Sequence, residues 1–140
     1  MNKKILIGGI AGGILFFLLG WLVYGILLMD YMSHHAGLKG NVNRSDADLQ
    51  MIYIFAGSVL QGILLAYVLV RTNVTTLSGG FITGAIVGFL ISSSVDLTMY
   101  GTTYVFSKHS IMADVIAATT ISALTGTVML VIINALSKKN

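Results

Sequence analysis

Two aspartates in apolar surroundings are the residues of this sequence best suited to chemistry. Asp96 lies in the run ISSSVDLT (91–98), inside a segment long enough to cross a bilayer, and Asp114 lies near the start of the next such segment. An ionisable side chain within a membrane span costs about 2.5–3.5 kcal/mol on insertion scales, so it marks a candidate functional site. Two carboxylates brought together in a low dielectric need a proton or cation between them, because both cannot stay ionised alone.

Hydroxyl groups near Asp96 extend this candidate site. They belong to Ser92, Ser93, Thr98 and Tyr100. Carboxylate and hydroxyl oxygens are the ligands that hard cations prefer, and they also surround a bound proton with hydrogen bonds. The sequence therefore predicts a proton- or cation-binding site at Asp96 and Asp114. In the structural alternative, Asp96 only hydrogen-bonds neighbouring side chains and Asp114 only complements the positive end of its helix dipole.

Three histidines in the connecting segments form a second candidate site. His34 and His35 follow Asp30, and His109 lies between the last two apolar segments. Imidazole and carboxylate groups together bind transition metals or respond to external pH. Adjacent histidines rarely point at the same ion, and no helical His-x-x-x-His spacing is present, so solvated loop histidines are the favoured alternative.

No motif in the sequence specifies a reaction. There is no cysteine, and therefore no thiol nucleophile and no thiolate metal site. Neither a nucleophile elbow nor a zinc-protease helix motif is present, and the glycine-rich stretches lack the Lys-Ser/Thr of a phosphate-binding loop. We therefore expect neither enzymatic activity nor a cofactor.

The composition explains what surrounds the candidate sites. The 140 residues are 56% hydrophobic and only 9% charged, and the mean hydropathy is +0.90. Soluble domains carry about 25% charged residues, so lipid must cover this surface. The few basic residues lie at the ends of apolar segments, which suits a membrane interface and not nucleic acid.

Four apolar segments approach the roughly 20 residues that cross a bilayer. They span about 5–29, 49–70, 80–104 and 111–136, with an outer loop at 33–47. This pattern predicts one all-α domain, a bundle of four transmembrane helices. Ser45 and Asp48 match a capping box and predict the start of the second helix. Gly101 favours an early end of the third helix, which would place Asp96 and Asp114 at similar depth.

The basic residues predict the orientation of the chain. One side of the four-span arrangement would carry Lys3, Lys4, Arg71, Lys138 and Lys139; the other would carry Lys39, Arg44 and Lys108. The positive-inside rule then places both termini in the cytoplasm. Tyr24 and most other tyrosines lie toward the outer boundary, as expected of an interfacial aromatic belt.

Small residues recur every four positions, on one ridge of a helix. The third segment carries Gly80, Gly84, Gly88, Ser92 and Asp96; the fourth carries Asp114, Ala118, Ser122 and Gly126; the first carries the pair Gly8 and Gly12. Such residues let helix backbones approach closely in lipid. These ridges are expected to pack helices within the chain or against a second copy or another membrane protein.

Three short motifs give the chain a family likeness. They are the run GWLVYG (20–25), the run VDLT (95–98) and the run MAD (112–114), which small residues follow to Gly126. In these places the chain resembles small four-span bacterial inner-membrane proteins of unknown function. The resemblance implies a helical membrane bundle and draws attention to Asp96 and Asp114. In size the chain also looks like the small multidrug exporters, but it lacks their glutamate in the first span, which makes drug export doubtful.

Two functions remain open at this point. The first is a small transporter or sensor with an outward-side proton or cation site at Asp96 and Asp114. The second is a structural or accessory subunit whose glycine ridges dock a partner, without transport or catalysis. A homo-oligomer is expected under the first.

Overall fold

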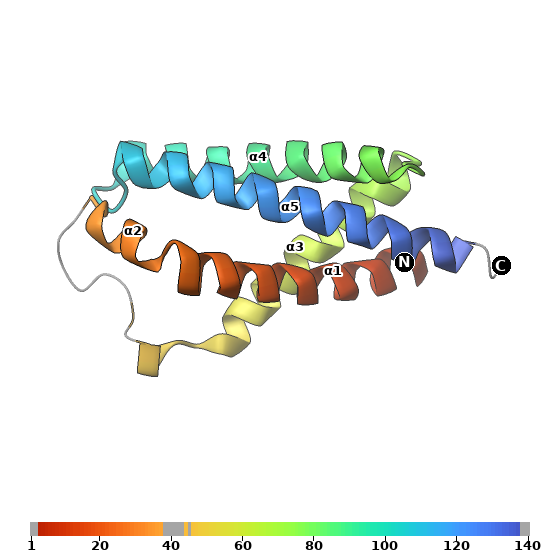
Figure 1. The fold of residues 1–140 in the computed structure, drawn as a ribbon, viewed down its shortest axis with the longest axis horizontal. Coiled ribbons are helices and arrows are strands. Elements are labelled where there is room, and N and C mark those ends of the chain that lie inside the picture. Colours follow the sequence, from red (N-terminus) through yellow and green to blue (C-terminus); the bar gives the residue numbers. More distant parts are fainter. Residues whose placement is uncertain (1–2, 38–43, 45, 138–140) are drawn as a thin grey trace.

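The computed structural model describes residues 3–37, 44 and 46–137, and within them every regular element is helical. Four helices are long and apolar enough to cross a membrane, which confirms the predicted all-α, four-span fold (Figure 1). The elements are α1 (Lys3–Leu22), η1 (Val23–Leu27), α2 (Met29–His34), η2 (Asp46–Asp48), α3 (Met51–Arg71), α4 (Leu77–Thr102) and α5 (Lys108–Ser137).

The helices pack as two antiparallel pairs. The closest packing joins α4 to α5 and α1 to α3, and contacts between α1 and α5 hold the two pairs together. Although α3 and α4 follow each other along the chain, they touch little, because α3 runs obliquely across the bundle (Figure 1). The beginning of α1 and the end of α5 lie at the same end of the bundle. Which side of the membrane this end faces stays a prediction from the basic residues.

Two boundaries differ from those expected. The first span does not continue as a regular helix to residue 29, because Val23–Leu27 form a π-helical turn in which the Leu28 N–H donates to the Val23 carbonyl at 2.7 Å. The predicted start of the second helix was too early: Asp46–Asp48 form a separate 3-10 turn, and α3 begins only at Met51. Aspartate side chains favour such local turns over helix interiors. Ser45 lies outside the described residues.

A tight turn reverses the chain between α3 and α4. The Val74 N–H donates to Leu69 O at 3.2 Å and the Asn73 N–H to Val70 O at 3.4 Å, which is the bond pattern of a Schellman motif. Asn73 has a φ of 53°, a left-handed conformation that asparagine tolerates better than most residues. Thr76 Oγ1 then accepts the Gly79 N–H at 3.1 Å and caps α4. This turn fixes where Arg71 lies at the end of α3.

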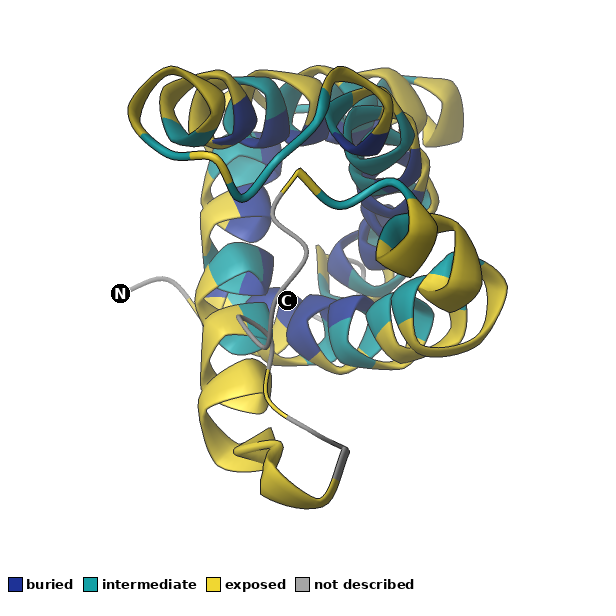
Figure 2. Cartoon of the chain, turned by 90° about the vertical axis from the view of Figure 1, so that its left-hand side faces the viewer, coloured by how far each residue is buried: buried dark blue, intermediate teal, exposed yellow. Residues whose placement is uncertain are grey.

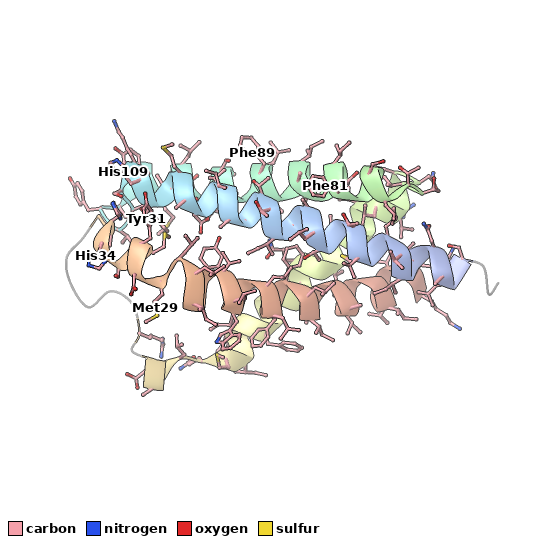
Figure 3. All side chains as sticks on the ribbon, viewed as in Figure 1. Met29, Tyr31, His34, Phe81, Phe89 and His109 are labelled. Atoms are coloured by element: carbon pink, nitrogen blue, oxygen red, sulfur yellow. The ribbon has the colours of Figure 1, made fainter. Side chains whose placement is uncertain are left out.

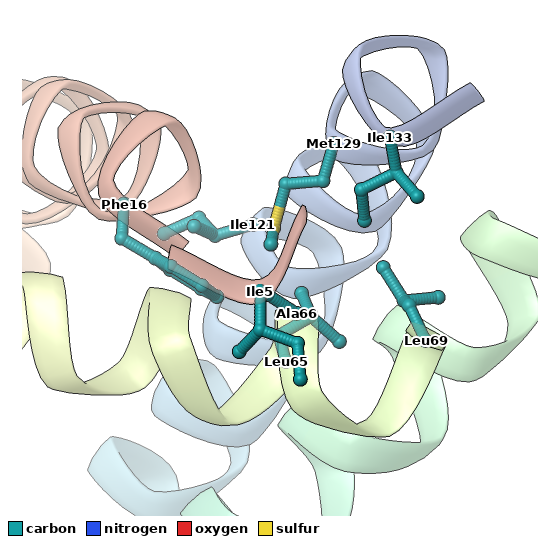
Figure 4. Close-up of a cluster of buried hydrophobic side chains, with 8 residues drawn as sticks. All are labelled: Ile5, Phe16, Leu65, Ala66, Leu69, Ile121, Met129 and Ile133. Atoms are coloured by element: carbon teal, nitrogen blue, oxygen red, sulfur yellow. The ribbon is translucent and has the colours of Figure 1, made fainter. Parts of the chain in front are cut away.

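Apolar side chains fill the interior and also cover the outside. The core draws on α1, α3 and α5 and contains Ile5, Phe16, Leu65, Ala66, Leu69, Ile121, Met129 and Ile133 (Figure 4). Buried residues lie on the inward faces of the helices (Figure 2). On the lipid-facing surface of α4, Phe81 is 47% and Phe89 50% exposed (Figure 3). A surface this apolar needs lipid, as expected of a multi-pass membrane protein.

The glycine ridges pack against other helices of the same chain. A Cβ atom at Gly84 would overlap the Ser122 carbonyl oxygen, and one at Gly126 would overlap the Gly80 carbonyl oxygen. Between α1 and α3, a Cβ atom at Gly62 would overlap backbone atoms of Gly9 and Gly13. Gly8 and Gly12 face the side chains of Ile133 and Met129 on α5, and Gly88 faces Ser122. These contacts set the spacing of both helix pairs.

Candidate functional site

Asp96 lies on the buried face of α4. Its side chain is only 3% exposed, and its ridge, from Gly80 through Gly88 and Ser92, is buried along its whole length. The Asp96 Oδ2 atom has no hydrogen-bond partner among the described residues. A buried polar group without a partner costs about 1–3 kcal/mol, and a charged group costs more. Such a group calls for an explanation beyond packing.

Two other side chains converge on Asp96. The carboxyl group of Asp114, half-buried in the second turn of α5, lies close to the side chains of Asp96 and Tyr24. The Tyr24 hydroxyl also donates a long hydrogen bond of 3.5 Å to the Asp114 carbonyl. We call Tyr24, Asp96 and Asp114 the carboxyl cluster. Because an ionised carboxylate only accepts hydrogen bonds, the two aspartates can bond to each other only when one holds a proton.

The hydroxyl groups expected around Asp96 are mostly occupied elsewhere. The Ser92 hydroxyl donates to Gly88 O at 2.9 Å, and the Thr98 hydroxyl donates to Ser94 O at 2.8 Å, so both bond to their own helix. Thr98 is exposed, Tyr100 is 41% exposed, and Ser93 is half-buried. The structure thus brings Asp114 to Asp96 but does not assemble a hydroxyl shell around them.

With this geometry in place, comparison with known proteins adds one finding. Residues 7–135 match the family described as "Protein of unknown function (DUF1761)". The chain belongs to the DUF1761 family. No curated protein and no solved structure matches it. The DUF1761 match covers the whole carboxyl cluster and agrees with the resemblance to four-span proteins of unknown function; since the family has no assigned activity, the function must be argued from the site.

Several site residues of this DUF1761 chain were missed from the sequence. Tyr24 was assigned only to the interfacial belt, yet it lies in the π turn and reaches α5. Thr119, Ser122 and Thr125 have buried hydroxyl oxygens without partners among the described residues. They continue along α5 from Asp114 toward the other end of the bundle. Of these three, only Ser122 was singled out from the sequence, because it lies four residues from Gly126 on the same helix ridge as Asp114.

The histidines of the DUF1761 chain divide into two groups at the end of the bundle opposite the start of α1 (Figure 3). The rings of His35 and His109 are 5.7 Å apart, and Tyr31 stacks on His35 at 4.1 Å. His34 instead bonds the Asp30 carbonyl through Nδ1 at 2.7 Å. Nowhere in the described part do three His, Cys, Asp or Glu residues gather as metal ligands would. His34, His35 and His109, the candidate metal ligands, are therefore not brought together as one group of ligands there.

Two hydrogen bonds beside His35 and His109 also join the two segments that carry these histidines. The Gly37 N–H donates to Val105 O at 3.0 Å, and the Ser107 hydroxyl donates to the His35 carbonyl. We call Tyr31, His35, Gly37, Ser107 and His109 the histidine clasp. It ties α2 to the turn between α4 and α5. This turn follows Asp96 in α4 and precedes Asp114 in α5.

Proposed function

We propose that this chain is a membrane protein whose carboxyl cluster binds and releases a proton in the outward half of the bilayer, in the service of transport or sensing. The observation that carries the proposal is the buried Asp96 Oδ2 atom, which has no partner in the described chain and lies beside a second carboxyl group. Buried pairs of acidic side chains in membrane helices are typical of proton relays.

A proton suits the cluster better than a hard metal cation. Ca²⁺ takes about six to eight oxygen ligands, and Mg²⁺ demands near-octahedral geometry. The cluster supplies two carboxyl groups and one phenol, and the nearby Ser92 hydroxyl is already engaged with its own helix. One proton, by contrast, needs only one carboxylate oxygen. The carboxyl group that holds the proton can then donate a hydrogen bond to the other, ionised carboxylate.

Loss of that proton has a mechanical consequence. Two negative charges would then lie on adjoining faces of α4 and α5 in a low dielectric, where repulsion is strong. Since Tyr24 contacts Asp114, the change also reaches the π turn of the first span. A protonation-dependent change of helix contacts is what a proton-linked transporter or sensor requires. The accessory-subunit hypothesis lacks comparable support, because the ridges that would dock a partner are packed within the chain.

The proposal is tested by melting the purified protein across about pH 5 to pH 9. We expect wild-type stability to fall as pH rises, because the folded state then must either hold a buried charge or unfold. Over the titration the loss is about 1.4 kcal/mol per pH unit for one proton. Asp96→Asn cannot ionise and is expected to remove this slope, and Asp114→Asn to reduce it.

The matched control is Asp30→Asn, which removes an exposed carboxyl group of α2 and should leave the slope intact. A wild-type protein with no slope, or an Asp96→Asn protein with an undiminished one, would refute the proton site and leave the aspartates as packing groups. Stabilisation at high pH by Na⁺ or Mg²⁺, absent in Asp96→Asn, would assign the site to a cation instead.

A further inference from the structure

We infer that His35 and His109 of the histidine clasp bind one divalent transition-metal ion of the Zn²⁺ and Cu²⁺ class, and that the ion holds α2 against the turn between α4 and α5. The sequence pointed to three histidines as candidate metal ligands, and the structure brings two of them together, with ring centroids 5.7 Å apart. The inference does not depend on the proposed proton site, because the clasp and the carboxyl cluster consist of different residues.

The spacing of the two rings fits a shared ion. A metal ion lies about 2.0–2.1 Å from an imidazole nitrogen, and therefore about 3.2 Å from the centroid of the ring. Two imidazole rings on one ion then have centroids about 4.5–6.4 Å apart, as the angle at the metal goes from about 90° to about 180°. The 5.7 Å between His35 and His109 lies within this range. His109 is exposed, so its ring can turn a nitrogen toward the ion.

A hydrogen bond sets the tautomer of His35. Its Nδ1 atom lies 2.9 Å from the Tyr31 carbonyl oxygen, and because a carbonyl oxygen only accepts, Nδ1 carries the hydrogen. In the neutral ring Nε2 then keeps the lone pair that a metal ion requires. Metal-bound histidines commonly donate from their other nitrogen to a backbone carbonyl, which orients the ring and raises its basicity. The Tyr31 ring, stacked on His35 at 4.1 Å, supports the same side chain from one face.

The backbone segments that carry the two histidines are held together by contacts within the chain. The Gly37 N–H donates to Val105 O at 3.0 Å, and the Ser107 hydroxyl donates to the His35 carbonyl. Gly37 approaches so closely that a Cβ atom there would overlap the Tyr104 carbonyl oxygen. A site whose parts are already in place needs less ordering when its ligand enters, which favours binding.

The donor set selects the class of metal. Imidazole nitrogens suit Zn²⁺, Cu²⁺ and Ni²⁺, whereas Mg²⁺ and Ca²⁺ prefer oxygen ligands. Two histidines leave the other positions around the ion to water, and Cu²⁺ should bind more tightly than Zn²⁺, in the general order of affinities for divalent metals. His34 ends α2 one residue before His35. Since successive helical residues point about 100° apart, His34 is directed elsewhere and provides a matched control.

The test measures metal binding by the whole protein, purified in detergent through a tag without histidines. Zn²⁺ is titrated by calorimetry, and Cu²⁺ by electron paramagnetic resonance, which counts the nitrogen atoms on the ion. We expect one Zn²⁺ per chain and two imidazole nitrogens on Cu²⁺, and neither binding nor stabilisation by Mg²⁺ at the same concentration. His109→Asn should lower the affinity for Zn²⁺ at least about tenfold and leave one nitrogen on Cu²⁺, because losing even the hydrogen-bond partner of a ligand costs about 10–100-fold. His35→Asn should do the same from the other segment.

Two variants serve as controls. His34→Asn removes an exposed imidazole and should leave both the Zn²⁺ affinity and the two-nitrogen signal intact. An equal loss in His34→Asn and His109→Asn would show binding by scattered surface histidines and refute the site, as would a single nitrogen on Cu²⁺ in the wild type. Asp96→Asn should retain Zn²⁺, and a loss in that variant would assign the ion to the carboxyl cluster.

Hydrogen exchange tests whether the ion holds the two segments together. The Gly37 amide is bonded to Val105 O, so it exchanges when the clasp opens. At a Zn²⁺ concentration ten times the dissociation constant, its exchange should slow about tenfold in the wild type and stay unchanged in His109→Asn. Unchanged exchange in a wild-type protein that binds Zn²⁺ through both histidines would overturn the role of the ion in closing the clasp.

Discussion

Replacing Gly84 with alanine is expected to force α4 away from α5 and to destabilise the protein severely. The added Cβ atom would overlap the Ser122 carbonyl oxygen and crowd the backbone of Ala123, and a backbone cannot move aside as a flexible side chain can. Overpacking of this kind costs about 1–3 kcal/mol, and more where backbone must shift. The measurement is the melting temperature in detergent, together with the fraction of protein that stays monodisperse.

The same helix supplies the control for this substitution. A Cβ atom at Gly101 meets nothing within 4 Å. Gly101→Ala should therefore keep or raise stability, because alanine is a better helix former by about 1 kcal/mol. The comparison repeats on α3, where Gly62→Ala should be harmful and Gly57→Ala harmless, since Gly57 also faces open space. Equal behaviour within either pair would contradict the close backbone contacts described above.

Truncating Leu65 to alanine is expected to cause the second large loss of stability. Leu65 is 0% exposed and lies in the core shared by α1, α3 and α5. Core leucine truncations cost about 2–5 kcal/mol in soluble proteins through lost transfer energy and an unfilled cavity. In a bilayer the transfer part shrinks because lipid tails are as apolar as leucine, so we expect about 2 kcal/mol here, from lost packing.

The control for the cavity is Leu60→Ala on the same helix. Leu60 is 69% exposed, so lipid or detergent can fill the space that its side chain leaves. Its effect should stay within about 0.5 kcal/mol. Reversible unfolding in mixed micelles measures both variants, and benzene should partly restore Leu65→Ala alone, because an apolar cavity accepts an apolar guest. Loss of equal size at both positions would show that position 65 is not part of a packed core.

The span count follows from the sequence because membrane spans are set by length and hydropathy alone. The buried ridge that leads to Asp96 was also predictable, since Gly80, Gly84 and Gly88 recur at the helical spacing and let a partner helix approach. What the sequence did not predict is the pairing of α1 with α3. This packing, and the oblique path of α3, depend on contacts of Gly9 and Gly13 with Gly62, and the four-residue spacing of Gly9 and Gly13 does not say which helix they meet.

For the candidate site, too, the sequence predicted some residues and missed others. Asp96 and Asp114 were found by their chemistry, but proximity in sequence was a poor guide to their neighbours. Thr98 lies two residues from Asp96 and faces outward, whereas Tyr24 comes from another helix and reaches Asp114. Tyr24 was missed because its direction depends on a π turn, and a regular helical projection assigns the wrong phase to residues within and after such a turn.

The π turn at Val23–Leu27 also determines how the chain would respond to a change in length. Such a turn accommodates one residue more than an α-helical turn does. Deleting Ile26 would let the first span continue as an ordinary α-helix, and the residues after the turn would keep their facing, because the deletion removes the one residue that the π turn adds. Tyr31 and His35 would stay opposite His109, and the histidine clasp would stay closed. Loss of one codon at this place would thus leave this end of the protein nearly unchanged, whereas loss of one from a regular helical turn rotates all later residues of the helix by about 100°.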